Sequence, residues 1–156
     1  MEALLAAFAA SVTARVDGLL QTSGREPNGR PRMQLTAIKS REVFLISQNL
    51  GANSKACCVD VAGIARAAAY LRSALADPPD LLIINKFSGL EAKGGGLRAE
   101  MLDALAMGVP LLCGLSARHQ DAFEDMTGRA GTYLPADLGA LRAWWKLVIP
   151  AKRSIQ

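Results

Sequence analysis

The sequence lacks a phosphate-binding loop, a long apolar run and a set of paired cysteines. No stretch reads G-x-x-x-x-G-K-[ST], the pattern that cradles nucleotide phosphates. No apolar run approaches the roughly 18–20 residues that cross a bilayer, so we expect no membrane partner. Three cysteines do not make a disulfide framework. The N-terminal stretch has helical spacing and carries Glu2 instead of an early basic cluster, so we expect a cytoplasmic protein without a signal peptide.

Aromatic and histidine side chains are also scarce. Aromatic residues make up 5% of the chain, and the net charge is only +4. Because the basic residues between positions 25 and 41 have no aromatic residues interleaved, we expect no nucleic-acid partner. The single histidine, His119, and the adjacent Cys57 and Cys58 do not form a zinc-site pattern. We therefore expect no metal and no cofactor.

The residues that are present predict one α/β domain over residues 1–150, followed by a frayed tail over residues 151–156. Half of the chain is hydrophobic, which is enough for a substantial core in 156 residues. The apolar runs at 80–85 and 110–115 are typical of parallel strands that are covered on both faces. Two shorter β-type runs, Met33–Ile38 and Glu42–Ser47, predict an antiparallel hairpin.

Local signals predict the remaining elements. A helix is expected over Glu2–Val16, broken by Asp17 and Gly18, then a short strand at 18–22 and a loop at 23–32. Further helices are expected after an Asp60 cap, from Leu97 to Gly108, over 117–126 with a Ser116 cap, and over Asp137–Val148.

The stretch Leu81–Arg98 carries the strongest site signal. Asn85 and Lys86 follow the buried strand, at the edge where α/β folds place ligands. Three glycines then precede a helix and leave backbone N–H groups for an anion, and Arg98 and Glu91 lie close by in sequence. The predicted ligand-binding residues here are Asn85, Lys86, Gly94, Gly95, Gly96 and Arg98. A solvated turn with a surface ion pair explains the same pattern about equally well.

A second polar stretch lies between the hairpin and the next helix. It reads GANSKACC and contains Ser54 and Lys55 near the expected start of that helix. Backbone amides at a helix start attract anions, so both residues join the candidate site. An ordinary polar connection remains the alternative. One of the two cysteines at 57 and 58 would be reactive if the helix start lowered its pKa, and idle otherwise.

Several of these motifs together resemble a known family. The chain resembles a bacterial family of uncharacterised P-loop NTPase-like proteins associated with molybdate transport genes. The motifs that carry the resemblance are ISQNLG, CCVD, PDLLIINKF, LEAKGGGLR and LGALRAWW. The resemblance covers nearly the whole chain from Leu4 onward. LLIINKFSGLEAKGGG followed by a helix and VPLLCGL also looks distantly like the thermophile nucleoside-triphosphatases. The resemblance implies a three-layer P-loop-NTPase-like sheet, mostly parallel with an antiparallel hairpin.

Two departures from that family pattern bear on activity. In the NTPases a strand and a phosphate loop precede the first helix, whereas this sequence opens directly into the helix. The acidic pair that would hold magnesium is replaced by Asn85 and Lys86, and only Glu91 matches. The first strand and phosphate loop are therefore expected to be missing. Neighbouring strands would then close up, another chain would fill the gap, or the start is truncated.

These observations predict a non-hydrolytic protein of P-loop NTPase ancestry that binds a small anion such as molybdate or phosphate. Two alternatives stay open. One is a nucleotide hydrolase or transferase that uses Lys86 as a charge clamp and Glu91 as base. The other is an adaptor that binds through an exposed sheet edge and the region of Trp144. The sequence also leaves a homo-oligomer open.

Overall fold

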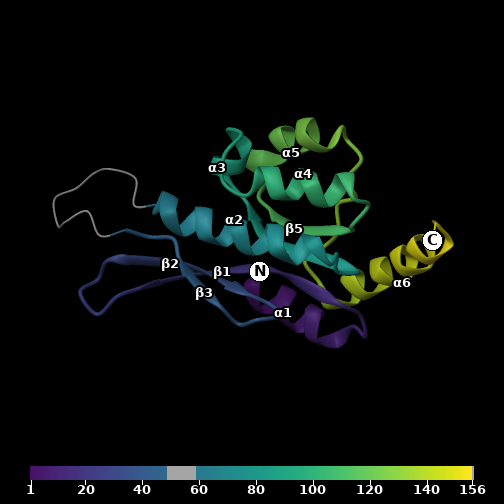
Figure 1. The fold of residues 1–156 in the computed structure, drawn as a ribbon, viewed down its shortest axis with the longest axis horizontal. Coiled ribbons are helices and arrows are strands. Elements are labelled where there is room, and N and C mark those ends of the chain that lie inside the picture. Colours follow the sequence, from purple (N-terminus) through teal and green to yellow (C-terminus); the bar gives the residue numbers. More distant parts are fainter. Residues whose placement is uncertain (49–58, 156) are drawn as a thin grey trace.

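The computed structural model describes residues 1–48 and 59–155, with side chains up to residue 150. Within them, a five-stranded mixed sheet carries helices on both faces (Figure 1). The strands are β1 (Val16–Arg25), β2 (Pro31–Ala37), β3 (Val43–Leu45), β4 (Leu81–Phe87) and β5 (Leu111–Leu115). The helical elements are α1 (Glu2–Ser11), α2 (Val61–Ala76), α3 (Gly89–Ala92), α4 (Arg98–Ala106), the 3-10 turn η1 (Ala117–His119), α5 (Gln120–Thr127) and α6 (Leu138–Ile155).

The order of strands across the sheet is β3-β2-β1-β4-β5. β4 pairs in parallel with both β1 and β5, whereas β2 pairs antiparallel with β1 and β3. The prediction of a mostly parallel sheet therefore describes the β1-β4-β5 half. β4 and β5 bond to each other directly, so the sheet has no gap between these two strands.

The two apolar runs become strands as predicted. β4 lies between β1 and β5, and six of its seven residues are buried. Asp60 caps α2, since its carboxylate accepts a hydrogen bond from the Ala62 amide at 3.0 Å. α2 then ends before Pro78 and Pro79, as proline geometry requires.

The predicted break at Asp17 and Gly18 is wrong. α1 ends earlier, at Ser11, and both residues lie inside β1. Gly18 has φ +137°, and a Cβ there would lie 1.8 Å from the Ile83 carbonyl oxygen of β4. Glycine is thus required by the close approach of two parallel strands and does not interrupt the chain.

The long loop predicted at 23–32 is also wrong in part. β1 extends to Arg25 and pairs with β2 down to Pro31, so only the tight turn at 26–30 remains. The second hairpin, between β2 and β3, is confirmed, although β3 has only three residues. Glycine and proline are common in turns, but backbone pairing with a neighbouring strand overrides that local preference here.

Two hydrophobic clusters hold the helices to the sheet. One lies between the sheet and α2, α4 and α5, with Leu71, Ile84 and Met101 fully buried. The other lies between the sheet and α1 and α6, and it buries Phe8, Ile83 and Trp145. Consecutive residues of β4 serve opposite clusters because side chains alternate across a strand.

The last part of the chain differs in detail from prediction. Ser116 makes no capping hydrogen bond, and η1 precedes α5 in place of one continuous helix. The segment at 131–135 is extended but belongs to no strand. α6 begins as expected, with the Asp137 carboxylate accepting from the Ala140 amide at 2.9 Å, and it runs to Ile155. Trp145 is buried and Trp144 half-buried.

Candidate functional site

The candidate site lies where β4 ends, at the carboxyl edge of the parallel half of the sheet. The first five residues of β4, from Leu81 to Asn85, are buried, and the next residue, Lys86, is exposed. The peptide bond between these two residues is cis. The strand thus delivers one cationic side chain to solvent at the edge where α/β proteins bind ligands.

Asn85 is 5% exposed, and its Oδ1 has no hydrogen-bond partner among the described residues. This oxygen lies against Gly114 of β5, where a Cβ would come within 2.4 Å of it. A buried acceptor without a donor is costly, so a donor at this point would be stabilising. A fully ionised oxyanion offers no donor, so Oδ1 does not bind one directly.

Glu91 has a clear local partner set. Its carboxylate accepts hydrogen bonds from the Ser88 amide at 3.0 Å, the Ser88 hydroxyl at 2.8 Å and the Leu97 amide at 3.1 Å. This is a capping box for α3 that also ties down the residue preceding α4. Because Glu91 is 4% exposed and engaged through both oxygens, it has the geometry of a structural cap rather than of a free base.

The glycine amides are also engaged in the chain itself. Gly94 N–H donates to the Glu91 carbonyl at 3.1 Å, and Gly95 N–H donates to the Leu90 carbonyl at 2.9 Å. Gly96, with φ +58°, packs against the Glu91 carboxylate. The turn predicted to cradle an anion is therefore filled largely by the protein's own carboxylate. Of the three glycines, only Gly96 has no hydrogen-bond acceptor for its amide among the described residues.

Arg98 lies in the first turn of α4 and is half-buried. Its Nη1 donates to the Glu91 carbonyl at 3.3 Å, which leaves the other guanidinium donors for a ligand. The structure therefore brings Lys86, Glu91, the glycines and Arg98 into one turn region after β4. Ser54 and Lys55, and with them Cys57 and Cys58, lie outside the described residues.

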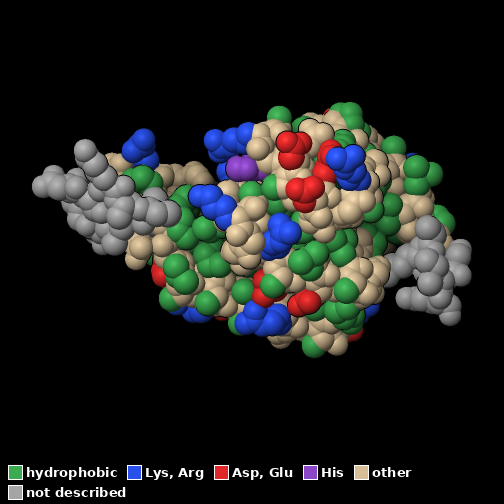
Figure 2. Space-filling view, turned by 90° about the horizontal axis from the view of Figure 1, so that it is seen from above, with side chains coloured by type: hydrophobic (Ala, Val, Ile, Leu, Met, Phe, Trp, Pro, Cys, Tyr) green, Lys and Arg blue, Asp and Glu red, His purple; other side chains and the backbone are tan. Residues whose placement is uncertain are grey.

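Sequence reasoning assigned no role to two further basic residues. Arg118 and His119 lie in η1, directly after β5, and so reach the same carboxyl edge as Lys86. Figure 2 shows the histidine beside Lys and Arg side chains on the face that carries α3, α4 and α5. Their position shortly after the apolar run at 110–115 could have predicted this placement, since Lys86 was predicted as a ligand from its position at the end of the run at 80–85.

A different polar cluster lies at the other end of the parallel strands, near the start of β1. Asp17 is 5% exposed, and both its oxygens accept from the Tyr70 hydroxyl, at 2.9 and 3.0 Å. The Lys39 amide donates to the same carboxylate at 3.4 Å. Burial, helped by the negative charge of Asp17, raises the pKa of Tyr70, so the hydroxyl stays a donor. The cluster joins β1, the turn after β2 and α2.

The described part of the chain lacks two further features. Among residues 1–48 and 59–155 no three His, Cys, Asp or Glu side chains gather as they would around a metal ion. Within the same ranges no helix combines the length and the apolar character that a bilayer span needs.

The fold and site define a mixed α/β domain whose parallel strands deliver basic residues to one edge. The chain belongs to the family described as protein of unknown function DUF2478, whose model matches residues 1–144. It is also 35% identical over 150 residues to molybdenum import ATP-binding protein ModC 2 of Bradyrhizobium diazoefficiens. That match covers 94% of this chain but only 17% of the relative. No solved structure matches the chain.

Proposed function

We propose that this chain is a non-hydrolytic, oxyanion-binding domain of P-loop NTPase ancestry that acts in molybdenum handling. The observation that carries the proposal is the exposed Lys86 at the end of the buried strand β4. A compact ammonium group at the ligand-binding edge of an α/β sheet suits a tetrahedral oxyanion such as molybdate.

Further basic groups support the same edge. Arg98 follows in the next helix with free guanidinium donors, and Arg118 and His119 follow the adjacent strand. Ser54 and Lys55 stay in the proposal as predicted ligands. Asn85 and Gly96 belong to the same turn region, but the amides of Gly94 and Gly95 have internal acceptors and contribute at most through backbone dipoles.

The relation to molybdenum rests on the comparison. The similar stretch belongs to a protein named for molybdenum import and ATP binding, and it makes up 17% of that protein. We infer that the shared domain serves the oxyanion, because Lys86 and Arg98 bring positive charge to the carboxyl edge of the parallel strands.

The hydrolase alternative has less support. It requires Glu91 as a general base with a lone pair free for a water molecule. Its carboxylate instead accepts three hydrogen bonds from Ser88 and Leu97. The carboxylate is also buried, so water has little access to its remaining lone pair.

Isothermal titration with sodium molybdate, tungstate, sulfate and phosphate tests the proposal. We expect heat with at least one of these oxyanions and an affinity at least tenfold lower in Lys86→Ala, since a charged hydrogen bond contributes about 1.5–3 kcal/mol. Lys146→Ala, which removes an exposed lysine from α6, is the matched control and should bind like the parent. The absence of heat with all four anions, or parent-like binding by Lys86→Ala, would refute the proposal.

A further inference from the structure

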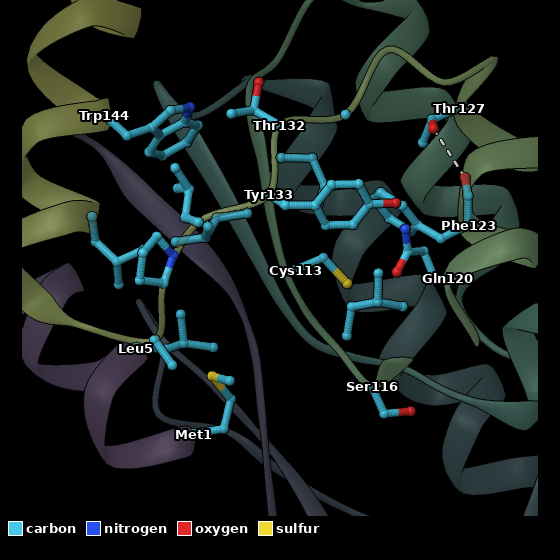
Figure 3. A pocket seen from close by; sticks show the side chains of 18 of the residues that line it. Met1, Leu5, Cys113, Ser116, Gln120, Phe123, Thr127, Thr132, Tyr133 and Trp144 are labelled. Carbon is cyan, nitrogen blue, oxygen red and sulfur yellow. Dashed lines mark hydrogen bonds between the residues drawn. The ribbon is translucent and has the colours of Figure 1, made fainter. Parts of the chain in front are cut away.

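A second candidate site lies on the outer side of β5, away from the basic residues. A cavity of about 560 Å³ separates β5 from the extended segment at 130–136, hereafter the strap. Figure 3 shows Cys113 of β5 at its centre, with Trp144 on one side, Tyr133 and Phe123 on the other, and Met1 and Leu5 below. The volume lies within the range of roughly 300–1,000 Å³ typical of ligand sites.

The side chains that line this cavity carry no formal charge. None of its lining residues is Asp, Glu, Lys, Arg or His. Its one thiol is also neutral, because burial raises the pKa of Cys113 to about 12. Lys86, Arg98, Arg118 and His119 are not part of the wall. None of these side chains would pair with molybdate or phosphate, so an uncharged occupant suits the cavity best.

The backbone edge of β5 faces outward along this cavity. The Leu82 amide bonds to the Pro110 carbonyl, so residues 110, 112 and 114 direct their polar groups toward β4. Leu111, Cys113 and Leu115 consequently direct theirs outward, because successive residues of a strand alternate. Within the described residues no backbone hydrogen bond joins this edge to the strap.

The strap is attached elsewhere. The Tyr133 hydroxyl donates to Glu124 Oε1 of α5 at 3.0 Å, and the Asp137 carboxylate caps α6. It thus runs past β5 without pairing with it. β5 also carries none of the charged side chains with which edge strands usually repel another strand.

We propose that β5 accepts an extended, uncharged peptide segment as an additional strand between β5 and the strap. Outward amide and carbonyl groups repeat at every second residue, a period that another β-strand matches along its whole length. The five residues of β5 set the occupant's length at about five residues. The proposal goes beyond oxyanion binding and specifies the occupant of a sheet edge close to Trp144.

Amide hydrogen exchange tests the proposal on the intact protein. The probe is an end-blocked pentapeptide of alternating threonine and valine. In the free protein the Leu111, Cys113 and Leu115 amides should exchange faster than the Leu112 amide, and saturating peptide should slow these three at least tenfold. The same peptide with alternate backbone nitrogens methylated should give no protection, since it cannot donate to the edge.

A matched pair of variants locates the binding. Thr132→Arg places a charge on the cavity wall and should lower the peptide affinity at least tenfold. Thr13→Arg makes the same change at an exposed position outside the cavity and should alter the affinity less than twofold.

Three outcomes would overturn the proposal. The first is no protection at millimolar peptide. The second is equal binding of the methylated peptide, which would make the cavity a hydrophobic pocket for small molecules. The third is protection of the three amides that rises with protein concentration alone, which would make a second copy of this chain the occupant.

Discussion

At the scale of single residues, the turn after β4 shows how one carboxylate can account for a pattern that looks like a ligand site. Glycines before a helix favour anions, and the anion found there is Glu91 itself. From the sequence alone, an external ligand and an internal carboxylate were equally plausible at this turn, because the sequence does not show that the Glu91 side chain points toward Gly96. The sequence likewise could not predict that Asn85 Oδ1 is buried against Gly114 without a hydrogen-bond donor among the described residues.

The capping role of Glu91 leads to a stability prediction. Glu91→Gln replaces one acceptor oxygen by a donor that faces the Ser88 or Leu97 amide, so we expect a loss of about 1–3 kcal/mol in the free energy of unfolding. Glu42→Gln, at an exposed position, is the control and should change stability little. Urea denaturation measures both. An unchanged stability for Glu91→Gln would mean that the carboxylate is free for another role.

At the scale of elements, the long apolar patterns were predictable and the strand ends were not. β4, β5 and the capped start of α2 follow from hydrophobicity and Asp60. The extension of β1 through residues 23–25 depends on pairing with β2, and the placement of Gly18 depends on the nearness of Ile83. Contacts between distant segments decided these points, and local propensity does not encode them.

A pair of glycines tests the packing between α2 and the sheet. Gly63→Ala would place a Cβ 2.0 Å from the Leu45 carbonyl oxygen of β3, so α2 or β3 has to shift. We expect a net loss of about 1–3 kcal/mol in unfolding free energy despite the better helix propensity of alanine. Gly89→Ala has nothing within 4 Å and should leave stability unchanged or slightly raised. Equal stability of the two variants in urea would contradict the close contact of α2 with β3.

At the scale of the whole molecule, the two proposed sites use different parts of one sheet. The oxyanion proposal uses the carboxyl end of β4, where side chains provide charge, and the peptide proposal uses the outer edge of β5, where the backbone provides hydrogen bonds. When both faces of a strand are covered, ligands can reach the side chains at its end. If the strand also lies at the edge of the sheet, ligands can reach its unpaired backbone groups as well. This division explains why a sequence motif pointed to the first region, whereas the second emerged only from the arrangement of β5 and the strap.

The sheet also couples the two hydrophobic clusters, and this coupling is testable. Ile83 and Ile84 are both fully buried, but Ile83 packs with α1 and α6 whereas Ile84 packs with α2 and α4. Because β4 belongs to both clusters, Ile83→Ala and Ile84→Ala should each lower the free energy of unfolding by about 2–5 kcal/mol. Each variant should also keep a single cooperative transition. Tryptophan fluorescence reports Trp145 in one cluster and far-ultraviolet circular dichroism reports all helices, so the two curves should coincide. Separate midpoints in either variant would show that the faces of the sheet unfold independently.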